Sequence, residues 1–365
     1  MKFEFYTSVS GTAFWNGLVR DLKVRGQEVE IISVMQEEAY RRPRNIFSKL
    51  LMRWKLYAGM SLHTRRHISS PIKQPTCRIA TTNPFFLPEL VREKTSPSAD
   101  VRTVNLVFDL YPEAIQLSGR QISPGTQQRL ESITSRSIER CHASVFLGER
   151  IQKYALGKYG TAPKTKVIPV GADAQSFAST QPEHLGTDHP VRFLYCGVLG
   201  RMHEVDTLAQ LGCGETLNGC EWHIHATGKG VRSLRGSWFQ VRGPLSSSTW
   251  PSAMKAAQVG VVSMLEGSEM VVLPSKTFSA LAAGQAILAI CPKDSDLADL
   301  VLKHDCGWVV APGDVKSLRL QIQNIVTNRD ELLAKRSNAY KVGQGIYSSD
   351  MVADKWVALG ESLFE

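Results

Sequence analysis

The stretch 269–290 constrains the fold more than any other part of the sequence. Pro274 suits the first turn of a helix, where its missing N–H is harmless. Small residues and good helix formers follow as far as Gly284, which stands where a helix ends. The uninterrupted apolar run 286–290 is typical of a strand buried on both faces of a parallel sheet. The stretch therefore predicts a loop, a helix and a buried strand of an α/β protein.

The helix in this stretch also begins where an anion could bind. Loops that lead into helices of parallel sheets collect free N–H groups at the positive end of the helix dipole. Lys276 adds a full positive charge to that first turn, and Glu269 stands just before it. A capped helix with a surface lysine explains the same residues, so the rest of the chain has to decide between the two interpretations.

Length and composition predict a two-domain protein of the cytoplasm. The chain has 365 residues, of which 43% are hydrophobic and 21% charged, as in soluble globular proteins. Its start lacks the apolar core of a signal peptide, and no run of about 18 apolar residues could span a membrane. The seven cysteines are scattered without a C-x-x-C pair, which indicates reduced thiols and no zinc site.

Strand, turn and helix patterns divide the chain into two Rossmann-like domains. We expect a first domain over 1–173, a polar linker over 174–190, a second domain over 191–345, and a last helix over 346–365 that could cross back to the first domain. Two turns of the first domain lie where parallel sheets bind ligands: Gly11-Thr12, before the helix at 13–24, and Asp109, after the strand at 101–108. Asp109 could equally be a helix cap.

The second domain begins with a pattern suited to phosphate. The strand at 191–196 runs into Gly197 and Gly200, which leave room for a ligand near the backbone. Arg201 and His203 then supply donors at the start of a helix. His223 and His225 alternate on a later strand, and without a third ligand we expect them to be structural.

The positive charge of the chain is concentrated in the segment 39–88. No Asp or Glu lies between Ala39 and Pro88, and ten basic residues of that segment leave −1 of the net charge of +9 for the rest of the chain. A helix is expected over 46–60, with apolar residues at i, i+3 and i+4. Three interpretations of this segment are open: a core-packed helix with a charged outer face, a helix that lies on an anionic membrane, and a nucleic-acid site. The segment contains no known nucleic-acid motif. The residues predicted to face a membrane are Arg41, Arg42, Arg44, Lys49, Arg53, Trp54 and Lys55.

These motifs together resemble the retaining GT-B glycosyltransferases of glycosyltransferase family 4. The resemblance is strongest at 196–204, at 241–243, and from Glu269 through Pro274-Ser275-Lys276 to Gly284, with support from 109–113 and 167–173. It implies two Rossmann-like domains with parallel sheets that face a central cleft. It also implies transfer of a sugar from a nucleotide diphosphate sugar to a hydroxyl acceptor, with a UDP-sugar as the favoured donor. The family needs no metal, and no other cofactor is expected.

The resemblance also implies roles for individual residues. Arg201 and Lys276 would neutralise the leaving diphosphate, Glu269 would contact the donor sugar, and Val241 and Gly243 would border the base pocket. Asp109, counted with these three charged residues as catalytic, would face the acceptor together with Gly11 and Thr12. The full donor-binding set is Gly197, Gly200, Arg201, His203, Gly228, Val241, Gly243, Glu269, Pro274, Ser275, Lys276 and Ser279.

Two departures from the family pattern keep alternatives open. Ser279 stands where relatives carry a glutamate that grips the ribose, and a hydroxyl makes a weaker contact than a carboxylate. Val205 and Asp206 replace the lysine expected after the Gly-Arg turn. A non-catalytic or altered nucleotide-sugar-binding protein of the same fold, or a GT-B epimerase, are therefore the other readings. The basic segment suggests a lipid-linked or surface-polysaccharide acceptor at the inner face of the plasma membrane.

Overall fold

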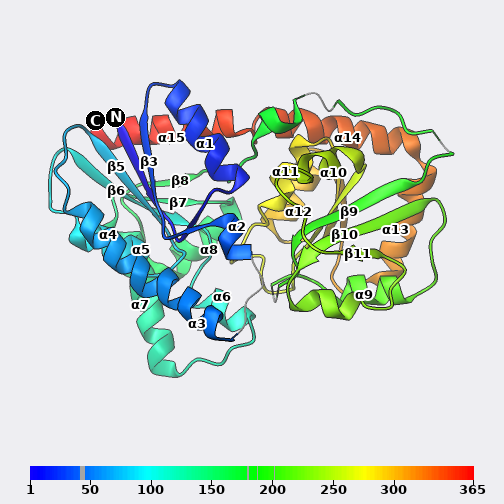
Figure 1. Cartoon of the computed structure of the whole chain (residues 1–365), viewed down its shortest axis with the longest axis horizontal. Helices are drawn as coiled ribbons and strands as arrows, with labels where there is room; N and C mark the ends of the chain where they lie inside the picture. Colours follow the sequence, from blue (N-terminus) through cyan, green and yellow to red (C-terminus); the bar gives the residue numbers. More distant parts are fainter. Residues whose placement is uncertain (42–45, 179–180, 187, 201) are drawn as a thin grey trace. The chain divides into compact units, whose positions relative to one another are not determined.

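The chain folds into two compact α/β units, shown in Figure 1. A computed structural model describes every residue except 42–45, 179–180, 187 and 201. The first unit comprises Met1–Gln116, Gln121–Pro169 and Ser349–Glu365, and the second comprises Leu117–Arg120 and Val170–Ser348. The polar segment 174–190 thus belongs to the second unit, whereas the last helix belongs to the first.

The first unit is built on a six-stranded parallel sheet in the order β3-β1-β5-β6-β7-β8. Figure 1 shows helices on both faces, with α1 and α15 together on one face and α4, α5 and α7 on the other. Right-handed crossovers produce this division when the strand order reverses direction after β3. The strands are β1 (Lys2–Tyr6), β3 (Glu28–Ile32), β5 (Thr76–Thr81), β6 (Val101–Val107), β7 (Ala143–Phe146) and β8 (Thr165–Val167), with β2 (Val9–Ser10) and β4 (Met35–Gln36) paired separately. The helices are α1 (Ala13–Val24), α2 (Glu37–Arg41), α3 (Ile46–Trp54), α4 (Met60–Ile68), α5 (Leu87–Lys94), α6 (Glu113–Leu117), α7 (Pro124–Arg140), α8 (Glu149–Tyr159) and α15 (Ser349–Phe364).

The second unit repeats this plan with a parallel sheet in the order β11-β10-β9-β12-β13-β14. Its core gathers apolar side chains from these strands and from the helices packed on them. The strands are β9 (Val191–Val198), β10 (Cys220–Thr227), β11 (Gln240–Arg242), β12 (Val259–Ser263), β13 (Ala286–Ile290) and β14 (Gly307–Val310). The helices are α9 (Asp206–Cys213), α10 (Trp250–Ala256), α11 (Lys276–Ala282), α12 (Asp296–Lys303), α13 (Val315–Thr327) and α14 (Arg329–Gln344), with short 3-10 turns at Ala174–Phe177 and Lys229–Leu234.

The stretch 269–290 forms the loop, helix and strand that the sequence predicts. Strand β13 is buried along its whole length between β12 and β14, and Gly284 takes the left-handed φ of 68° just after the helix. Helix α11 begins at Lys276, so Pro274 lies before the helix rather than in its first turn. The carbonyl of Pro274 instead accepts a hydrogen bond from the Thr277 N–H at 3.1 Å, which closes the turn that leads into α11.

The expected helix at 46–60 is part of a longer helical segment. Helix α3 runs through a π-helical turn at Lys55–Gly59 into α4, which ends at Ile68. Helix α3 has no buried residue, so a core-packed helix is excluded there. Among the helices that the structure describes, none is long and apolar enough to cross a membrane.

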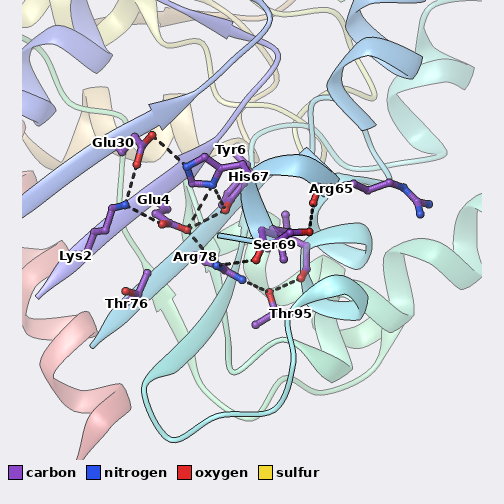
Figure 2. Close-up of polar contacts among 12 residues, drawn as sticks. Lys2, Glu4, Tyr6, Glu30, Arg65, His67, Ser69, Thr76, Arg78 and Thr95 are labelled. Atoms are coloured by element: carbon purple, nitrogen blue, oxygen red, sulfur yellow. Dashed lines mark hydrogen bonds and ion pairs between the residues drawn. The ribbon is translucent and has the colours of Figure 1, made fainter. Parts of the chain in front are cut away.

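Helix α4 is fixed to the sheet by a network of charged groups, shown in Figure 2. The buried Glu4 of β1 accepts hydrogen bonds from the Arg78 guanidinium of β5 at 3.0 Å and from the Tyr6 hydroxyl at 2.9 Å. His67, near the end of α4, lies 3.0 Å from the Tyr6 hydroxyl through Nδ1 and 3.1 Å from Glu30 through Nε2. The network therefore joins β1, β3 and β5 to α4, and the ring of His67 is held at both nitrogens.

Helix α14 holds the carboxyl end of α11 at close range. Gly343 lies where a Cβ atom would overlap the backbone of Leu281 and Ala282. Beside it, the Gln344 amide donates to the Ala282 carbonyl at 2.9 Å, and the Arg336 guanidinium donates to the Gly284 carbonyl at 3.1 Å. These donors satisfy carbonyls that a helix leaves unpaired at its end.

We expect Gly343→Ala to destabilise the second unit, because the added methyl group meets backbone atoms that have no room to move. Overpacking of this kind costs about 1–3 kcal/mol, or a melting temperature lower by roughly 2–8 °C. Gly157→Ala in α8 is the matched control, since a Cβ there meets nothing within 4 Å and alanine favours a helix by about 1 kcal/mol. Thermal unfolding of both variants checks this, and equal melting temperatures would contradict the close packing.

Candidate functional site

The second unit places a lysine against a tyrosine ring at the carboxyl edge of its sheet. Lys276 is the first residue of α11, and its Nζ lies 2.5 Å from the Tyr195 hydroxyl oxygen and 3.9 Å from the centroid of that ring. Tyr195 is fully buried in β9, and its hydroxyl donates to the Val198 carbonyl at 2.9 Å. The tyrosine oxygen is thus an acceptor for the ammonium, while the ring gives a cation–π contact.

Burial sets the charge state of this lysine. The surroundings withhold water from the ammonium and lower the pKa of Lys276 to about 7. No carboxylate among the described residues raises this pKa again, so the lost hydration of the ammonium is not replaced by an ion pair there. An anion that arrived beside Nζ would therefore stabilise the charged form and raise the pKa of Lys276 again.

His203 adds a neutral donor beside the lysine. Burial, and then the charge of Lys276, lower the pKa of His203 to about 3, so its ring is uncharged at neutral pH. The Gly200 N–H donates to Nδ1 of that ring at 3.2 Å, which leaves the ring proton on Nε2. The predicted pair Gly200 and His203 is thereby joined through one hydrogen bond.

The loop before α11 is tied to this glycine turn. The Leu265 N–H donates to the Met202 carbonyl at 3.1 Å, and both segments follow the neighbouring strands β12 and β9. Glu269 lies in that loop, and its Oε2 is buried without a hydrogen-bond partner among the residues that the structure describes. A buried carboxylate oxygen of this kind needs a donor, which a ligand hydroxyl could supply.

The other predicted donor-binding residues lie along the same sheet edge. Pro274 and Ser275 precede Lys276, and the half-buried Ser279 lies one turn further along α11. Val241 is in β11 and Gly243 follows that strand, with the Gly243 carbonyl 3.2 Å from His225 Nδ1. Gly197 is the residue before the last of β9 and has a φ of 138°. Gly228 has a packing role, because a Cβ there would overlap the Leu199 carbonyl. Arg201 lies outside the described residues.

The acceptor-side residues of the sequence analysis lie in the first unit. Gly11 and Thr12 turn the chain into α1, where the Thr12 hydroxyl accepts the Trp15 N–H at 3.3 Å. The ring of Phe14 in that helix lies 6.3 Å from the ring of Phe108, the residue before Asp109. The structure therefore brings the two predicted turns to one region of this unit.

Asp109 lines a small cavity at the carboxyl end of β6. Thr82, Asn105 and Tyr111 are among its other lining residues. The Thr82 hydroxyl donates to the Asp109 carbonyl at 2.7 Å and accepts the Asp109 N–H at 3.1 Å, which fixes the backbone there. Burial raises the pKa of the Asp109 carboxyl to about 6, within reach of proton transfer near neutral pH.

Two groups of residues that contain histidine were considered as metal ligands. Glu4, Glu30 and His67 lie close enough to share an ion, but the Lys2 ammonium already lies 3.0 Å from Glu4 and 2.8 Å from Glu30. Lys2 and Arg78 thus balance both carboxylates in Figure 2, and the group is better explained as an ion-pair network. His223 pairs with Glu221 at 3.2 Å rather than with His225.

Sequence reasoning did not find Tyr195. A tyrosine inside an apolar run is typical of a core strand. Only the folded structure shows that Tyr195 lies next to Lys276.

No protein-family model matches the sequence, and no curated protein sequence matches it.

Solved structures match the whole fold. Sucrose-phosphate synthase from Thermosynechococcus elongatus superimposes with a TM-score of 0.70 and 15% identity, covering 100% of this chain and 99% of that one. HepE from Anabaena, solved with UDP, gives 0.62 and 13%, covering 99% of each chain. A variant of S. aureus TarM, also solved with UDP, gives 0.61 and 14% over 84% of this chain and 59% of that chain. The chain therefore has the GT-B fold of these glycosyltransferases.

We expect Lys276→Met to raise the melting temperature of the ligand-free protein at pH 6–7, because it removes a poorly hydrated charge. The folded pKa of Lys276 is about 7 and its ordinary value is 10.5, so the unfolded chain binds the extra proton between these values. Wild-type stability then rises with pH across that window, and the advantage of the variant should shrink towards pH 10.

Thermal unfolding at several pH values measures this difference, which should reach about 2 °C or more at pH 6–7. Lys303→Met at the exposed end of α12 is the control and should change little at any pH. A Lys276→Met variant that is less stable than wild type at pH 6 would show that the buried ammonium does not destabilise the folded protein.

Proposed function

We propose that this protein is a retaining glycosyltransferase that moves a sugar from a nucleotide diphosphate sugar to a hydroxyl acceptor. The observation that carries the proposal is the cation of Lys276 beside His203 at the carboxyl edge of β9 and β12, with no carboxylate paired to it in the part of the chain that the structure describes. Solved neighbours of the same fold include proteins crystallised with UDP, which supports UDP-sugar as the first donor to test. One neighbour, a trehalose-6-phosphate synthase, is described as transferring with retention.

The chain's own groups suffice for the charge that develops in such a transfer. As the bond from sugar to phosphate breaks, the diphosphate gains negative charge, and Lys276 would stabilise it at the amino end of α11. His203 would donate from Nε2 to a phosphate oxygen, and Arg201 would add a second full charge. We therefore propose transfer without a metal or other cofactor.

Glu269 and Ser279 would recognise the remainder of the donor. The unpartnered Oε2 of Glu269 suits a sugar hydroxyl, which can donate a hydrogen bond to it. Ser279 lies one turn after Lys276 on α11, and its single hydroxyl would contact the ribose more weakly than a carboxylate would. Val241 and Gly243 would border the base.

The acceptor would be a hydroxyl group received by the first unit. Asp109 would face it, with a carboxyl pKa of about 6 that allows hydrogen bonding in either protonation state near neutrality. We propose a lipid-linked or surface-polysaccharide intermediate as the acceptor class, and action in the cytoplasm at the inner face of the plasma membrane. The basic segment 39–88 is the observation that supports this part.

A thermal-shift panel with UDP, GDP, ADP and their sugar conjugates tests donor binding. A ligand of the folded state raises stability by RT ln(1 + [L]/Kd), so one nucleotide should raise the melting temperature in a concentration-dependent way. Lys276→Met should lower the affinity for that nucleotide about 10- to 100-fold, because one charge-assisted contact is lost, whereas Lys303→Met should leave the affinity unchanged. A panel without any responder would count against the transferase and favour a protein whose ribose site is disabled at Ser279.

Nucleotide binding should also take up a proton. Lys276 is about half charged near pH 7 in the free protein and fully charged beside a diphosphate, so affinity should fall as pH rises from 7 to 9. The slope should approach tenfold per pH unit, measured by calorimetry in buffers of different ionisation enthalpy. Lys276→Arg keeps its charge at every pH and should flatten the profile. An unchanged slope in that variant would exclude Lys276 as the titrating group.

A further inference from the structure

Helix α3 carries a row of large apolar side chains that are exposed to solvent. Ile46 is 80% exposed, Phe47 77% and Trp54 57%, and the helix has no buried residue. We call this row the α3 apolar face, which consists of Ile46, Phe47, Leu50, Leu51 and Trp54, and the exposed Tyr57 follows it in the π-helical turn. Contiguous exposed apolar surface of this kind is characteristic of an interaction site.

The α3 apolar face points away from the protein. At about 100° per residue, its members fall within roughly 140° of the helix circumference. The residues opposite, Ser48 and Met52, are the partly covered ones, so they mark the side that meets the protein. A surface helix of a globular domain normally buries its apolar side, and α3 has the reverse orientation.

Cations border this face on both sides. Lys49 and Arg53 lie along one edge and Lys55 along the other, and all three are exposed. No acid occurs between Ala39 and Pro88, and no ion pair of these three is found within the part of the chain that the structure describes. Arg65 and Arg66 extend the positive charge along α4.

The rest of the segment holds α3 in place. Met60, Thr64 and Ile68 of α4 are buried, and His67 joins the network of Figure 2. Figure 1 shows α3 continuing the course of α4 beyond the π-helical turn. The apolar face is therefore presented by an anchored helix rather than by a free tail.

We propose that the α3 apolar face docks on an anionic lipid bilayer. Trp54, Phe47 and Ile46 enter the boundary between headgroups and acyl chains, and the flanking cations meet lipid phosphates. An anionic bilayer offers an apolar layer under a negative surface, which matches both the face and its border. Of the predicted membrane-facing residues, Arg42 and Arg44 lie outside the described residues and Arg41 ends α2. This docking deepens the membrane location proposed above by naming the surface that would meet the lipid, and it does not depend on the proposed sugar transfer.

Co-sedimentation of the full chain with lipid vesicles tests the proposal. Vesicles of phosphatidylcholine with 30% phosphatidylglycerol are compared with vesicles of phosphatidylcholine alone, at low and high salt. The apolar variant is Ile46→Ser, Leu50→Ser and Trp54→Ser together, and the charge variant is Lys49→Gln with Arg53→Gln. Leu302→Ser with Leu320→Ser, at exposed leucines of α12 and α13, and Lys153→Gln with Lys166→Gln are the matched controls.

Wild type should bind the anionic vesicles and lose most binding at high salt, because the Debye length falls. The apolar variant should bind about 100-fold more weakly and the charge variant about 25-fold, whereas both controls should bind like wild type. All altered side chains are exposed, so unchanged melting temperatures should show that the variants fold.

Three results would overturn the proposal. One is absence of wild-type binding to anionic vesicles, and another is equal binding by the apolar variant. The third is a dimer in solution, measured by light scattering, that dissociates in the apolar variant while neither protein binds vesicles. The face would then join two copies of this chain.

Discussion

A lysine ammonium kept from water is unfavourable until an anion joins it, and the site of the second unit depends on that imbalance. The protein supports the charge with an uncharged partner, Tyr195, instead of a carboxylate. A carboxylate would have satisfied Lys276 and competed with any phosphate. Helix α14 then fixes α11 from the opposite end, so the charge stays in place without a ligand. Folding stability is thus given up where binding can recover it.

The two units carry opposite charges at corresponding edges of their sheets. Asp109 follows β6 and Lys276 follows the loop after β12, in both cases near carboxyl ends of parallel strands. Burial moves the pKa of each towards neutrality, to about 6 for the acid and about 7 for the base. Each group can therefore change its charge when a ligand arrives, at little cost near neutral pH.

The sequence predicts those features that neighbouring residues decide. Strand β13 and helix α1 have the bounds that their apolar patterns indicate, and Gly284 ends its helix. Features that depend on contacts between residues distant in the sequence could not be predicted from such patterns. The periodicity of α3 shows which side chains share a face, but only the packing around it shows that this face points outward. For the same reason the role of Tyr195 requires the fold.

The last helix of the chain completes the first unit. Trp356 of α15 packs edge-on against Phe5 of β1 with ring centroids 5.6 Å apart, and Arg25, the residue after α1, pairs with Asp350 and Asp354 of α15. During synthesis the ribosome makes residues 170–348 before it makes α15. The second unit is therefore nearly contiguous and can fold while it is made, whereas the first waits with the part of its sheet beside α1 that α15 covers still open. The order of synthesis and the order of completion are reversed in this chain.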